Sequence, residues 1–358
     1  MKIGFLIANY NNGGGTERVT SVLANELSNR GYKISIISFT DGLNPTYQTN
    51  KNISLYSIYN EQKHGIMKKF HNLRALHKIV KISQIDILIV VDVRLYIYAH
   101  WIKYINHCKI ISWEQFNYYR PTDKLGKISQ YLAARYSDYL VTLSKNDLIN
   151  YQKNVKKLVP ATYIYNPVTI NENGITDLDN KKIIAVGRLE EEKGFDLLIK
   201  SWSKLENLFP DWKLEIFGKG TRKDELLNLI SELDLKNIKL RGYSNNIEDE
   251  YKKASFFVLS SRYEGFGLVL TEAQMYGLPC ISYDITGPNE IVEDNVNGFL
   301  VDRFDIDEFA KKMSELMCDP EKLTVFSQNA RKNIYRYELN SIVKKWEKVF
   351  KDISEIKE

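Results

Sequence analysis

The stretch that organises the chain is Phe256-Phe257-Val258-Leu259-Ser260-Ser261-Arg262-Tyr263-Glu264-Gly265-Phe266-Gly267-Leu268-Val269-Leu270-Thr271-Glu272. Its first four residues form a continuous apolar run, which predicts a buried strand. Gly265 and Gly267 allow a sharp turn and a close approach of the backbone to a ligand. From Leu268 the pattern becomes helical until Gly277-Leu278-Pro279 ends it. The unpaired N–H groups at the start of this helix predict an anion site.

Two glutamates bracket the turn, with Glu264 at the mouth of the predicted anion site and Glu272 about two helical turns further on. A carboxylate is a poor partner for an anion, because it can only accept hydrogen bonds when ionised. We therefore interpret Glu264 as an acceptor for hydroxyl groups, such as those of a sugar. The spacing alone does not separate this hypothesis from two unrelated surface glutamates.

The size and composition predict two globular domains, because 358 residues exceed one ordinary core. No apolar run approaches the roughly 18 residues that a membrane helix needs. Three widely separated cysteines, Cys108, Cys280 and Cys318, predict a reduced cytoplasmic protein without disulfides or a zinc site.

The charge is divided unevenly along the chain. Residues 1–170 carry 22 Lys and Arg against 10 Asp and Glu, a net +12, and residues 171–358 carry 28 against 35, a net −7; together these give the overall +5. One basic and one acidic half indicate two domains with different partners. The chain shows no nucleic-acid motif, so an anionic membrane is the partner we favour for the basic half.

Strand and helix patterns alternate along both halves, which predicts parallel sheets covered on both faces. The predicted domains are residues 1–168 and 169–340, with the polar stretch Asn171–Lys182 as a linker between them. A final apolar-periodic helix occupies residues 341–358.

Arg188 and Lys193 lie in the turn Gly187-Arg188-Leu189-Glu190-Glu191-Glu192-Lys193-Gly194, directly after a predicted strand. Ligands of open α/β folds bind at this edge of the sheet. A guanidinium fork and a compact ammonium together suit a diphosphate. The alternative is that both cations only balance Glu190–Glu192 on a solvated loop.

A second glycine-rich turn, Gly13-Gly14-Gly15, separates the first strand from the first helix. It also offers free N–H groups and close backbone approach. The spacing does not fit the dinucleotide fingerprint, although Asp41 lies near the place of that fingerprint's acidic residue, so a dinucleotide site stays open.

Taken in order, these motifs resemble those of glycosyltransferase family 4, a family of retaining glycosyltransferases with the GT-B fold. The resemblance covers nearly the whole chain and is strongest from Ile183 to Leu300. It implies two Rossmann-like doubly wound parallel-sheet domains facing a cleft, with helix 341–358 crossing back onto the N-terminal, acceptor-binding domain. It also implies transfer from a nucleotide diphosphate sugar, expected to be a UDP-sugar, to a hydroxyl of a glycan acceptor in bacterial surface-polysaccharide synthesis. No cofactor and no metal are expected.

The resemblance assigns roles to matching positions of this sequence. Glu264 would face the donor sugar, Glu272 would hold the ribose hydroxyls, and Tyr243 would lie near the base. The full set expected to bind the nucleotide sugar is Gly14, Gly15, Arg188, Lys193, Gly218, Tyr243, Glu264, Phe266, Gly267, Leu268 and Glu272. Those expected to act in catalysis are Glu264, Arg188, Lys193 and Gln115.

Gln115 departs from the family pattern, which has a histidine in the segment Ser112-Trp113-Glu114-Gln115-Phe116-Asn117. Glutamine donates and accepts hydrogen bonds but does not titrate. Two alternatives therefore stay open: a sugar-nucleotide epimerase of similar fold, and a non-catalytic partner subunit that binds a nucleotide sugar.

The segment 63–81 contains six Lys and Arg residues, two of which are Lys68 and Lys69, and no acidic residue. Apolar residues recur at helical spacing along one side: Ile66, Phe70, Leu73, Leu76 and Val80. We expect this basic helix to hold the protein at the anionic inner face of the cytoplasmic membrane, where a lipid-linked acceptor would be presented.

Overall fold

The computed structural model describes residues 1–58, 65–170 and 174–355, without the side chains of residues 65–70. The chain forms two compact units, one of residues 1–169 with the segment from Leu339 onward, and one of Ile170–Glu338. The predicted domain boundaries, 168/169 and 340/341, lie beside these divisions. Residues 63 and 64 of the predicted basic helix lie outside the described residues. So do residues 171–173 of the predicted linker.

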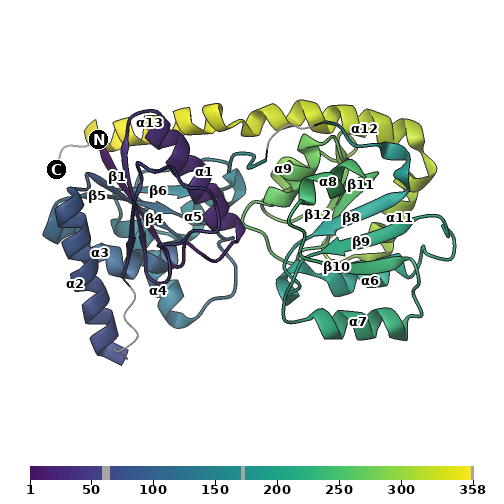
Figure 1. The fold of residues 1–358 in the computed structure, drawn as a ribbon, viewed down its shortest axis with the longest axis horizontal. Coiled ribbons are helices and arrows are strands. Elements are labelled where there is room, and N and C mark those ends of the chain that lie inside the picture. The colour runs from purple at the N-terminus through teal and green to yellow at the C-terminus, as the bar shows by residue number, and fades with distance from the viewer. Residues whose placement is uncertain (59–64, 171–173, 356–358) are drawn as a thin grey trace. The chain divides into compact units, whose positions relative to one another are not determined.

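The first unit is a parallel α/β sandwich (Figure 1). Within the described residues its seven-stranded sheet has the order β3-β2-β1-β4-β5-β6-β7. Its elements are β1 (Lys2–Ile7), α1 (Gly15–Asn29), β2 (Lys33–Ser38), β3 (Ser54–Ser57), α2 (Gly65–Ser83), β4 (Ile87–Val91), η1 (Val93–Leu95), α3 (Tyr96–Asn106), β5 (Lys109–Trp113), α4 (Lys124–Tyr136), β6 (Tyr139–Thr142), α5 (Lys145–Asn154), β7 (Ala161–Tyr163) and α13 (Leu339–Glu355).

The second unit repeats the scheme with a six-stranded parallel sheet, in the described part of the chain, of order β10-β9-β8-β11-β12-β13. Its elements are η2 (Leu178–Asn180), β8 (Lys182–Val186), η3 (Glu191–Lys193), α6 (Phe195–Trp202), β9 (Lys213–Phe217), α7 (Lys223–Glu232), β10 (Ile238–Gly242), α8 (Ile247–Lys252), β11 (Phe256–Leu259), α9 (Leu268–Met275), β12 (Cys280–Tyr283), α10 (Pro288–Ile291), β13 (Gly298–Val301), α11 (Ile306–Cys318), α12 (Pro320–Asn333) and η4 (Ile334–Tyr337). These two parallel sheets confirm the predicted α/β fold.

The C-terminal helix α13 packs on the first unit through its apolar stripe. The Trp346 ring meets Trp113 edge-on with ring centroids 5.0 Å apart, and Phe350 meets Tyr32 at 5.9 Å. Arg30 of α1 adds an ion pair with Glu347 at 2.9 Å. Burial of aromatic rings supplies most of the free energy of such a contact.

Some sequence-based boundaries were wrong. The pattern of residues 128–136 predicts a helix that starts at Ile128, but α4 begins at Lys124, where the Asp123 side chain accepts the N–H of Gly126 as a cap. The run Tyr163-Ile164-Tyr165 predicts a short strand, but β7 covers Ala161–Tyr163. Four elements were not predicted: β3, α5, α8 and α12. Within the described ranges, every helix is too short or too polar to span a bilayer.

Candidate active site

The candidate site lies at the point where the second sheet changes direction. The chain adds β9 and β10 on one side of β8 and then crosses to β11 on the other side. Ligands of open α/β sheets bind outside the carboxyl ends of the two strands at such a switch point. The turn with Arg188 and Lys193 follows β8, and the loop with Glu264 follows β11. The structure therefore brings two segments predicted to bind ligand to one edge of the sheet.

Lys193 and Glu264 form an ion pair across these segments. Lys193 Nζ lies 2.6 Å from Glu264 Oε1, with the two side chains 18% and 10% exposed. The Ser261 hydroxyl donates to the same oxygen at 2.7 Å. Oε2 of Glu264 has no hydrogen-bond partner among the described residues. A partly buried carboxylate with one oxygen held and one unused is suited to accept a hydroxyl of a ligand.

Arg188 is placed differently, since its side chain is 61% exposed and pairs with Glu192. The alternative that both cations only balance the loop glutamates thus holds for Arg188 and not for Lys193, which pairs with Glu264 instead. Glu190 binds Thr221 through both oxygens, at 2.9 Å to the backbone N–H and 2.7 Å to the hydroxyl. These hydrogen bonds lower the pKa of Glu190.

The two loops are held together at three consecutive carbonyl groups. The carbonyl of Glu191 accepts from Arg262 Nη1 at 2.9 Å, that of Glu192 from the Arg262 N–H at 2.7 Å, and that of Lys193 from the Ser260 hydroxyl at 3.0 Å. We call this set of contacts the loop brace. Gly194 makes the close approach possible, because a Cβ there would lie 2.1 Å from the Ser260 carbonyl oxygen.

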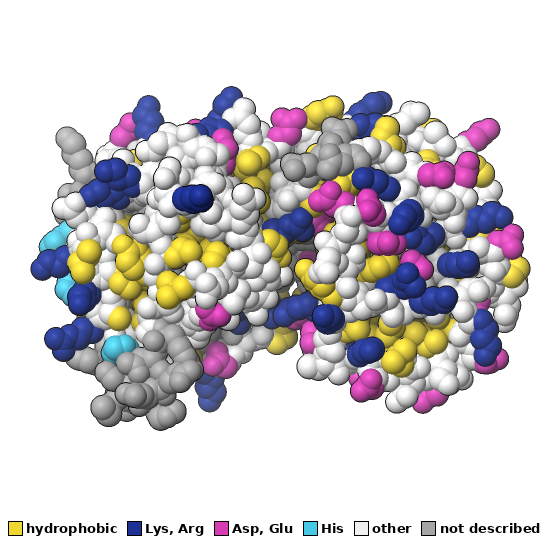
Figure 2. Space-filling model, viewed as in Figure 1, with side chains coloured by type: hydrophobic (Ala, Val, Ile, Leu, Met, Phe, Trp, Pro, Cys, Tyr) yellow, Lys and Arg dark blue, Asp and Glu magenta, His cyan; other side chains and the backbone are white. Residues whose placement is uncertain are grey.

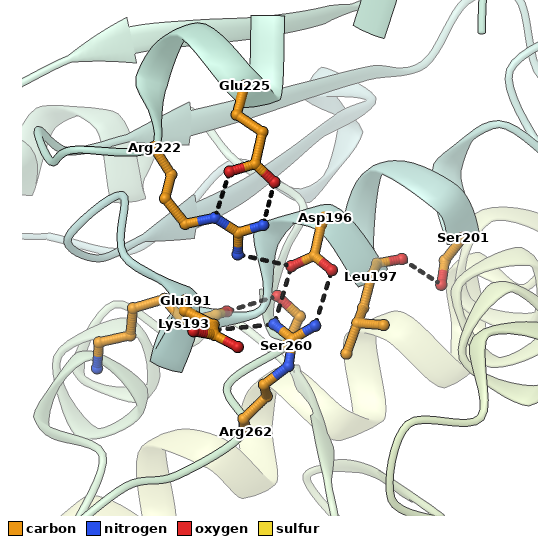
Figure 3. Close-up of polar contacts among 9 residues, drawn as sticks. All are labelled: Glu191, Lys193, Asp196, Leu197, Ser201, Arg222, Glu225, Ser260 and Arg262. Carbon is orange, nitrogen blue, oxygen red and sulfur yellow. Dashed lines mark hydrogen bonds and ion pairs between the residues drawn. The ribbon is translucent and has the colours of Figure 1, made fainter. Parts of the chain in front are cut away.

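Asp196 holds the arginine of the loop brace in place (Figure 3). Its two oxygens accept from Arg262 Nη1 and Nη2 at 2.8 and 2.7 Å, and Arg222 approaches Oδ1 at 3.4 Å. Burial raises the pKa of Asp196, but the hydrogen bonds and charge of Arg262 outweigh it and leave the pKa lowered. In Figure 3 the Lys193 side chain points away from this network.

The other glycine turns of the second unit pack around the same sheet edge. A Cβ on Gly218 would lie 1.8 Å from the Gly187 carbonyl oxygen, so the turn after β9 requires glycine against the turn after β8. Tyr243, which follows β10, is an exposed ring with Lys219 Nζ 5.4 Å from its centroid.

Helix α9 begins as predicted, with Gly267 at its N-cap in a left-handed conformation (φ 101°) and Leu268 as its first residue. Phe266 is buried against Tyr337, with ring centroids 5.6 Å apart. Glu272 is also buried, and the Tyr251 hydroxyl donates to its Oε2 at 3.3 Å. Its surroundings therefore differ from those of Glu264, although both belong to one motif.

The candidate residues of the first unit follow β1 and β5. Gly14 caps α1, and its N–H donates to Glu17 Oε2 at 2.9 Å, so this amide is already satisfied; Gly15 is the first residue of the helix. Gln115 is buried, and its Nε2 has no hydrogen-bond partner among the described residues. A buried amide donor without a partner costs free energy unless a ligand satisfies it.

Glu114, beside Gln115, is a fully buried carboxyl group. Its Oε1 accepts the N–H of Phe116 at 3.1 Å, and its Oε2 accepts the Tyr151 hydroxyl. Burial, followed by the charge of Asp92, raises the pKa of Glu114 to about 8. The carboxyl group is therefore mainly protonated at neutral pH.

The comparisons with known proteins agree with this geometry. A family model described as Glycosyl transferases group 1 matches residues 169–333. A Haemophilus influenzae protein described as an uncharacterized glycosyltransferase is 33% identical over 350 residues, which span 96% of this chain and 98% of the relative.

The chain belongs to the glycosyl transferases group 1 family. The amylovoran biosynthesis glycosyltransferase AmsD of Erwinia amylovora is 28% identical over 361 residues, spanning 96% of this chain and 98% of the relative. A Campylobacter jejuni alpha-1,4-N-acetyl-D-galactosaminyltransferase is 27% identical over 364 residues, spanning 99% of both; its name gives GalNAc-alpha-(1->4)-GalNAc-alpha-(1->3)-diNAcBac-PP-undecaprenol as its substrate.

The fold of this glycosyltransferase matches that of solved structures. A mutant of S. aureus TarM, solved with Fondaparinux, alpha-GlcNAc-glycerol and UDP, superposes with a TM-score of 0.83 at 17% identity, covering 98% of this chain and 99% of the other. The predicted GT-B fold is thus confirmed.

Sequence reasoning missed two side chains that organise the site of this glycosyltransferase, Asp196 and Arg262. Arg262 was seen only as the end of a strand. The signal that could have found it is its position two residues before Glu264, in the segment that must leave the strand and reach the neighbouring turn. Asp196 had no comparable signal, since its partner is 66 residues away.

We expect Asp196→Asn to weaken the loop brace, because the amide keeps the shape but loses the charge that pairs with Arg262. Donor turnover should fall by about tenfold or more, and the free energy of unfolding by about 1–3 kcal/mol. The control is Glu225→Gln, since Glu225 contacts Arg222 on the side away from Arg262. Steady-state kinetics and urea unfolding of both variants check this, and equal turnover of the two variants would contradict it.

The raised pKa of Glu114 predicts how stability depends on pH. A protonated buried carboxyl group contributes stability below its ordinary pKa, and this contribution is lost as the pH rises through about 8. We expect the melting temperature of the wild type to fall from about pH 6 to about pH 9, and that of Glu114→Gln to fall less. Identical slopes for the two proteins, measured by differential scanning calorimetry, would show that Glu114 is ionised in the folded state.

Proposed function

We propose that this glycosyltransferase moves a sugar from a UDP-sugar to a hydroxyl of a glycan acceptor, with retention at the anomeric carbon. The observation that carries the proposal is the contact of 2.6 Å between Lys193 and Glu264 at the switch point of the second sheet. One group of this pair matches the charge of a diphosphate and the other matches the hydroxyls of a sugar. A UDP-sugar presents both features side by side.

Lys193 and Arg188 bind the diphosphate. An ammonium group has three donors, so Lys193 can keep its contact with Glu264 and also donate to a phosphate oxygen. Arg188 must exchange Glu192 for phosphate, and its exposure leaves the guanidinium able to turn. The amides at the start of α9 add partial positive charge. No resident metal or cofactor is needed for this binding.

The reaction follows a front-face route. The bond between the anomeric carbon and the β-phosphate oxygen breaks, and the acceptor oxygen bonds to the same face of that carbon. The leaving phosphate takes the proton of the acceptor hydroxyl. Lys193 and Arg188 stabilise the negative charge that develops on the diphosphate, which is usually the largest contribution to such a rate enhancement. Glu264 orients the sugar through Oε2. This route follows from the resemblance to glycosyltransferase family 4, to which we assign the chain.

Gln115 supplies a hydrogen bond in place of the histidine of the family pattern. Its buried Nε2 gains a partner when substrate binds. Gln115→Ala is therefore expected to lower the rate more than donor affinity. A loss of rate in Gln115→Ala distinguishes an active transferase from a non-catalytic partner subunit, because the latter has no rate to lose.

The proposed acceptor is a lipid-linked glycan of bacterial capsule, O-antigen or exopolysaccharide synthesis, and the transferred unit is a hexose or N-acetylhexosamine. The names of the Erwinia and Campylobacter relatives support both statements. The protein would act in the cytoplasm at the inner face of the membrane. Helix α2 supports this, since Leu76 and Val80 are buried and Arg74, Lys78 and Lys81 are exposed. Figure 2 shows Lys, Arg and His side chains along the edge of the first unit where α2 lies.

The direct test of the activity is incubation of the purified protein with a panel of nucleotide sugars. We expect slow hydrolysis of a UDP-sugar. Arg188→Ala should weaken UDP binding by about tenfold, and Lys193→Ala should weaken it more because it leaves Glu264 beside the diphosphate. Calorimetry measures both affinities, and variants that bind UDP as tightly as the wild type would remove the diphosphate assignment. UDP binding without turnover of any donor or acceptor would indicate a non-catalytic subunit.

Replacing each of the two glutamates of the motif by alanine should affect donor turnover and UDP affinity differently. Glu264→Ala should lower donor turnover while UDP affinity stays equal or rises, because a negative charge near the diphosphate is removed. Glu272→Ala should weaken UDP itself, because this residue is assigned to the ribose. Parallel calorimetry and hydrolysis assays check this, and equal losses of UDP affinity in both variants would refute the assignment.

A further inference from the structure

Two helices of the first unit, α3 and α4, expose a band of aromatic and aliphatic side chains. Trp101 is 57% exposed, Tyr104 53% and Ile105 51%, and their spacing places them on one face of α3. The exposed large apolar residues of α4 are Leu125, Ile128, Tyr131 and Tyr136. Single exposed apolar residues need no explanation, but a contiguous band on a protein surface marks an interaction site.

The band is continuous across the two helices, which lie side by side in Figure 1. The N–H of Ile97 in α3 donates to the Ser129 hydroxyl of α4 at 3.1 Å. The His100 ring lies 5.3 Å from Trp101, 5.6 Å from Tyr104 and 5.8 Å from Tyr136. Burial and the charge of Lys103 lower the pKa of His100, so this ring is mainly neutral and suits an apolar cluster.

The charged side chains within the helices that carry and border the band all have one sign, and the exposed carboxylate of Asp123 lies at the N-cap of α4. Helices α2, α3 and α4 contain no Asp or Glu. Lys124 and Lys127 of α4 and Lys78 of α2 are exposed. Helix α2 borders α3, since His77 Nδ1 lies 2.8 Å from Asn106 Oδ1. The nearby carboxylate of Asp138 is neutralised by Lys103 at 3.0 Å.

We propose that the α3–α4 band inserts into the headgroup region of an anionic lipid bilayer. This rests on the proposed function at a membrane surface and adds an apolar anchor to the basic helix α2. Tyr and Trp prefer the boundary between water and hydrocarbon, where the ring is buried and the polar tip stays hydrated. The surrounding cations match anionic headgroups. A protein partner would instead need acidic groups opposite the cations and a fixed shape opposite the rings.

The anchor and the basic helix differ in their response to salt. Attraction between exposed cations and headgroups is screened at about 1 M salt, where the Debye length is about 3 Å. Insertion of apolar side chains does not depend on this attraction. The proposal therefore predicts membrane binding that salt weakens but does not abolish.

Trp101 offers a specific probe of this surface. The chain has five tryptophans, and the other four, Trp113, Trp202, Trp212 and Trp346, are buried. Emission of the wild type should shift to shorter wavelength with phosphatidylglycerol vesicles at about 1 M salt, and brominated lipid should quench it. Trp101→Phe keeps an aromatic anchor but should lose both signals. A spectrum that vesicles leave unchanged in the wild type overturns the proposal.

Binding is measured by flotation with the same vesicles. The triple variant Trp101→Gln, Tyr104→Gln, Ile105→Gln should lose about tenfold or more of its vesicle partitioning at high salt. The matched control is Tyr335→Gln with Leu208→Gln, two exposed apolar residues of the second unit, and it should bind like the wild type. Equal partitioning of the triple variant and the wild type overturns the anchor and leaves the electrostatic contact of α2.

Two further readouts separate the possible failures. If sedimentation shows that the wild type self-associates and the triple variant does not, while vesicles leave Trp101 emission unchanged, the band is an interface between copies and the proposal is wrong. Donor hydrolysis is assayed on the same preparations. Loss of hydrolysis in every protein with normal vesicle binding would refute the proposed transfer reaction but support the anchor.

Discussion

The candidate site depends on the loop brace, the hydrogen bonds through which the segment after β11 holds the turn after β8. These segments are far apart in the sequence, and each is too rich in glycine and charge to hold its shape alone. Three successive carbonyl groups of the turn are satisfied by Arg262 and Ser260. Asp196 then fixes the guanidinium of Arg262 with two charge-assisted hydrogen bonds. As a result Lys193 and Glu264 are held in contact at 2.6 Å, and such preorganisation reduces the rearrangement needed during a reaction.

The two units differ in charge, which fits the different ligands that we propose for them. The second unit is acidic, but Lys193 and Arg188 lie together at one edge of its sheet. The surrounding negative charge disfavours anions that do not contact both cations. The basic first unit spreads its cations over α2 and α4 and exposes aromatic rings between them. The first pattern suits recognition of one small ligand, and the second suits a broad anionic surface.

Elements with continuous apolar runs could be predicted closely from the sequence. Strand β11 begins and ends at the predicted residues, since burial on both faces leaves an unbroken signal. Strand β3 was missed because Ser54-Leu55-Tyr56-Ser57 is a short edge strand without that signal. Helix α5 was missed because its sequence is mostly polar, although Ser144 is a clear N-cap.

The site was predictable in its parts but not in its assembly. The strand, turn and glycine patterns located Arg188, Lys193 and Glu264, because each follows a strand of a parallel sheet. The pairing of Lys193 with Glu264 spans 71 residues and depends on strand order, which the local pattern does not contain. The exposed face of α3 was missed for a related reason. Trp101 and Tyr104 are residue types common in protein cores, and only the packing of α3 in the structure shows that they face outward.

The central claim is that the braced turn and loop of the second unit form the diphosphate site. A crystal structure of the protein with bound UDP tests this most directly. The account predicts β-phosphate oxygens within hydrogen-bond distance of Lys193 Nζ and the Arg188 guanidinium, with Arg262 still bonded to Asp196 and to the Glu191 carbonyl. A diphosphate bound elsewhere, or one that touches neither cation, would contradict it.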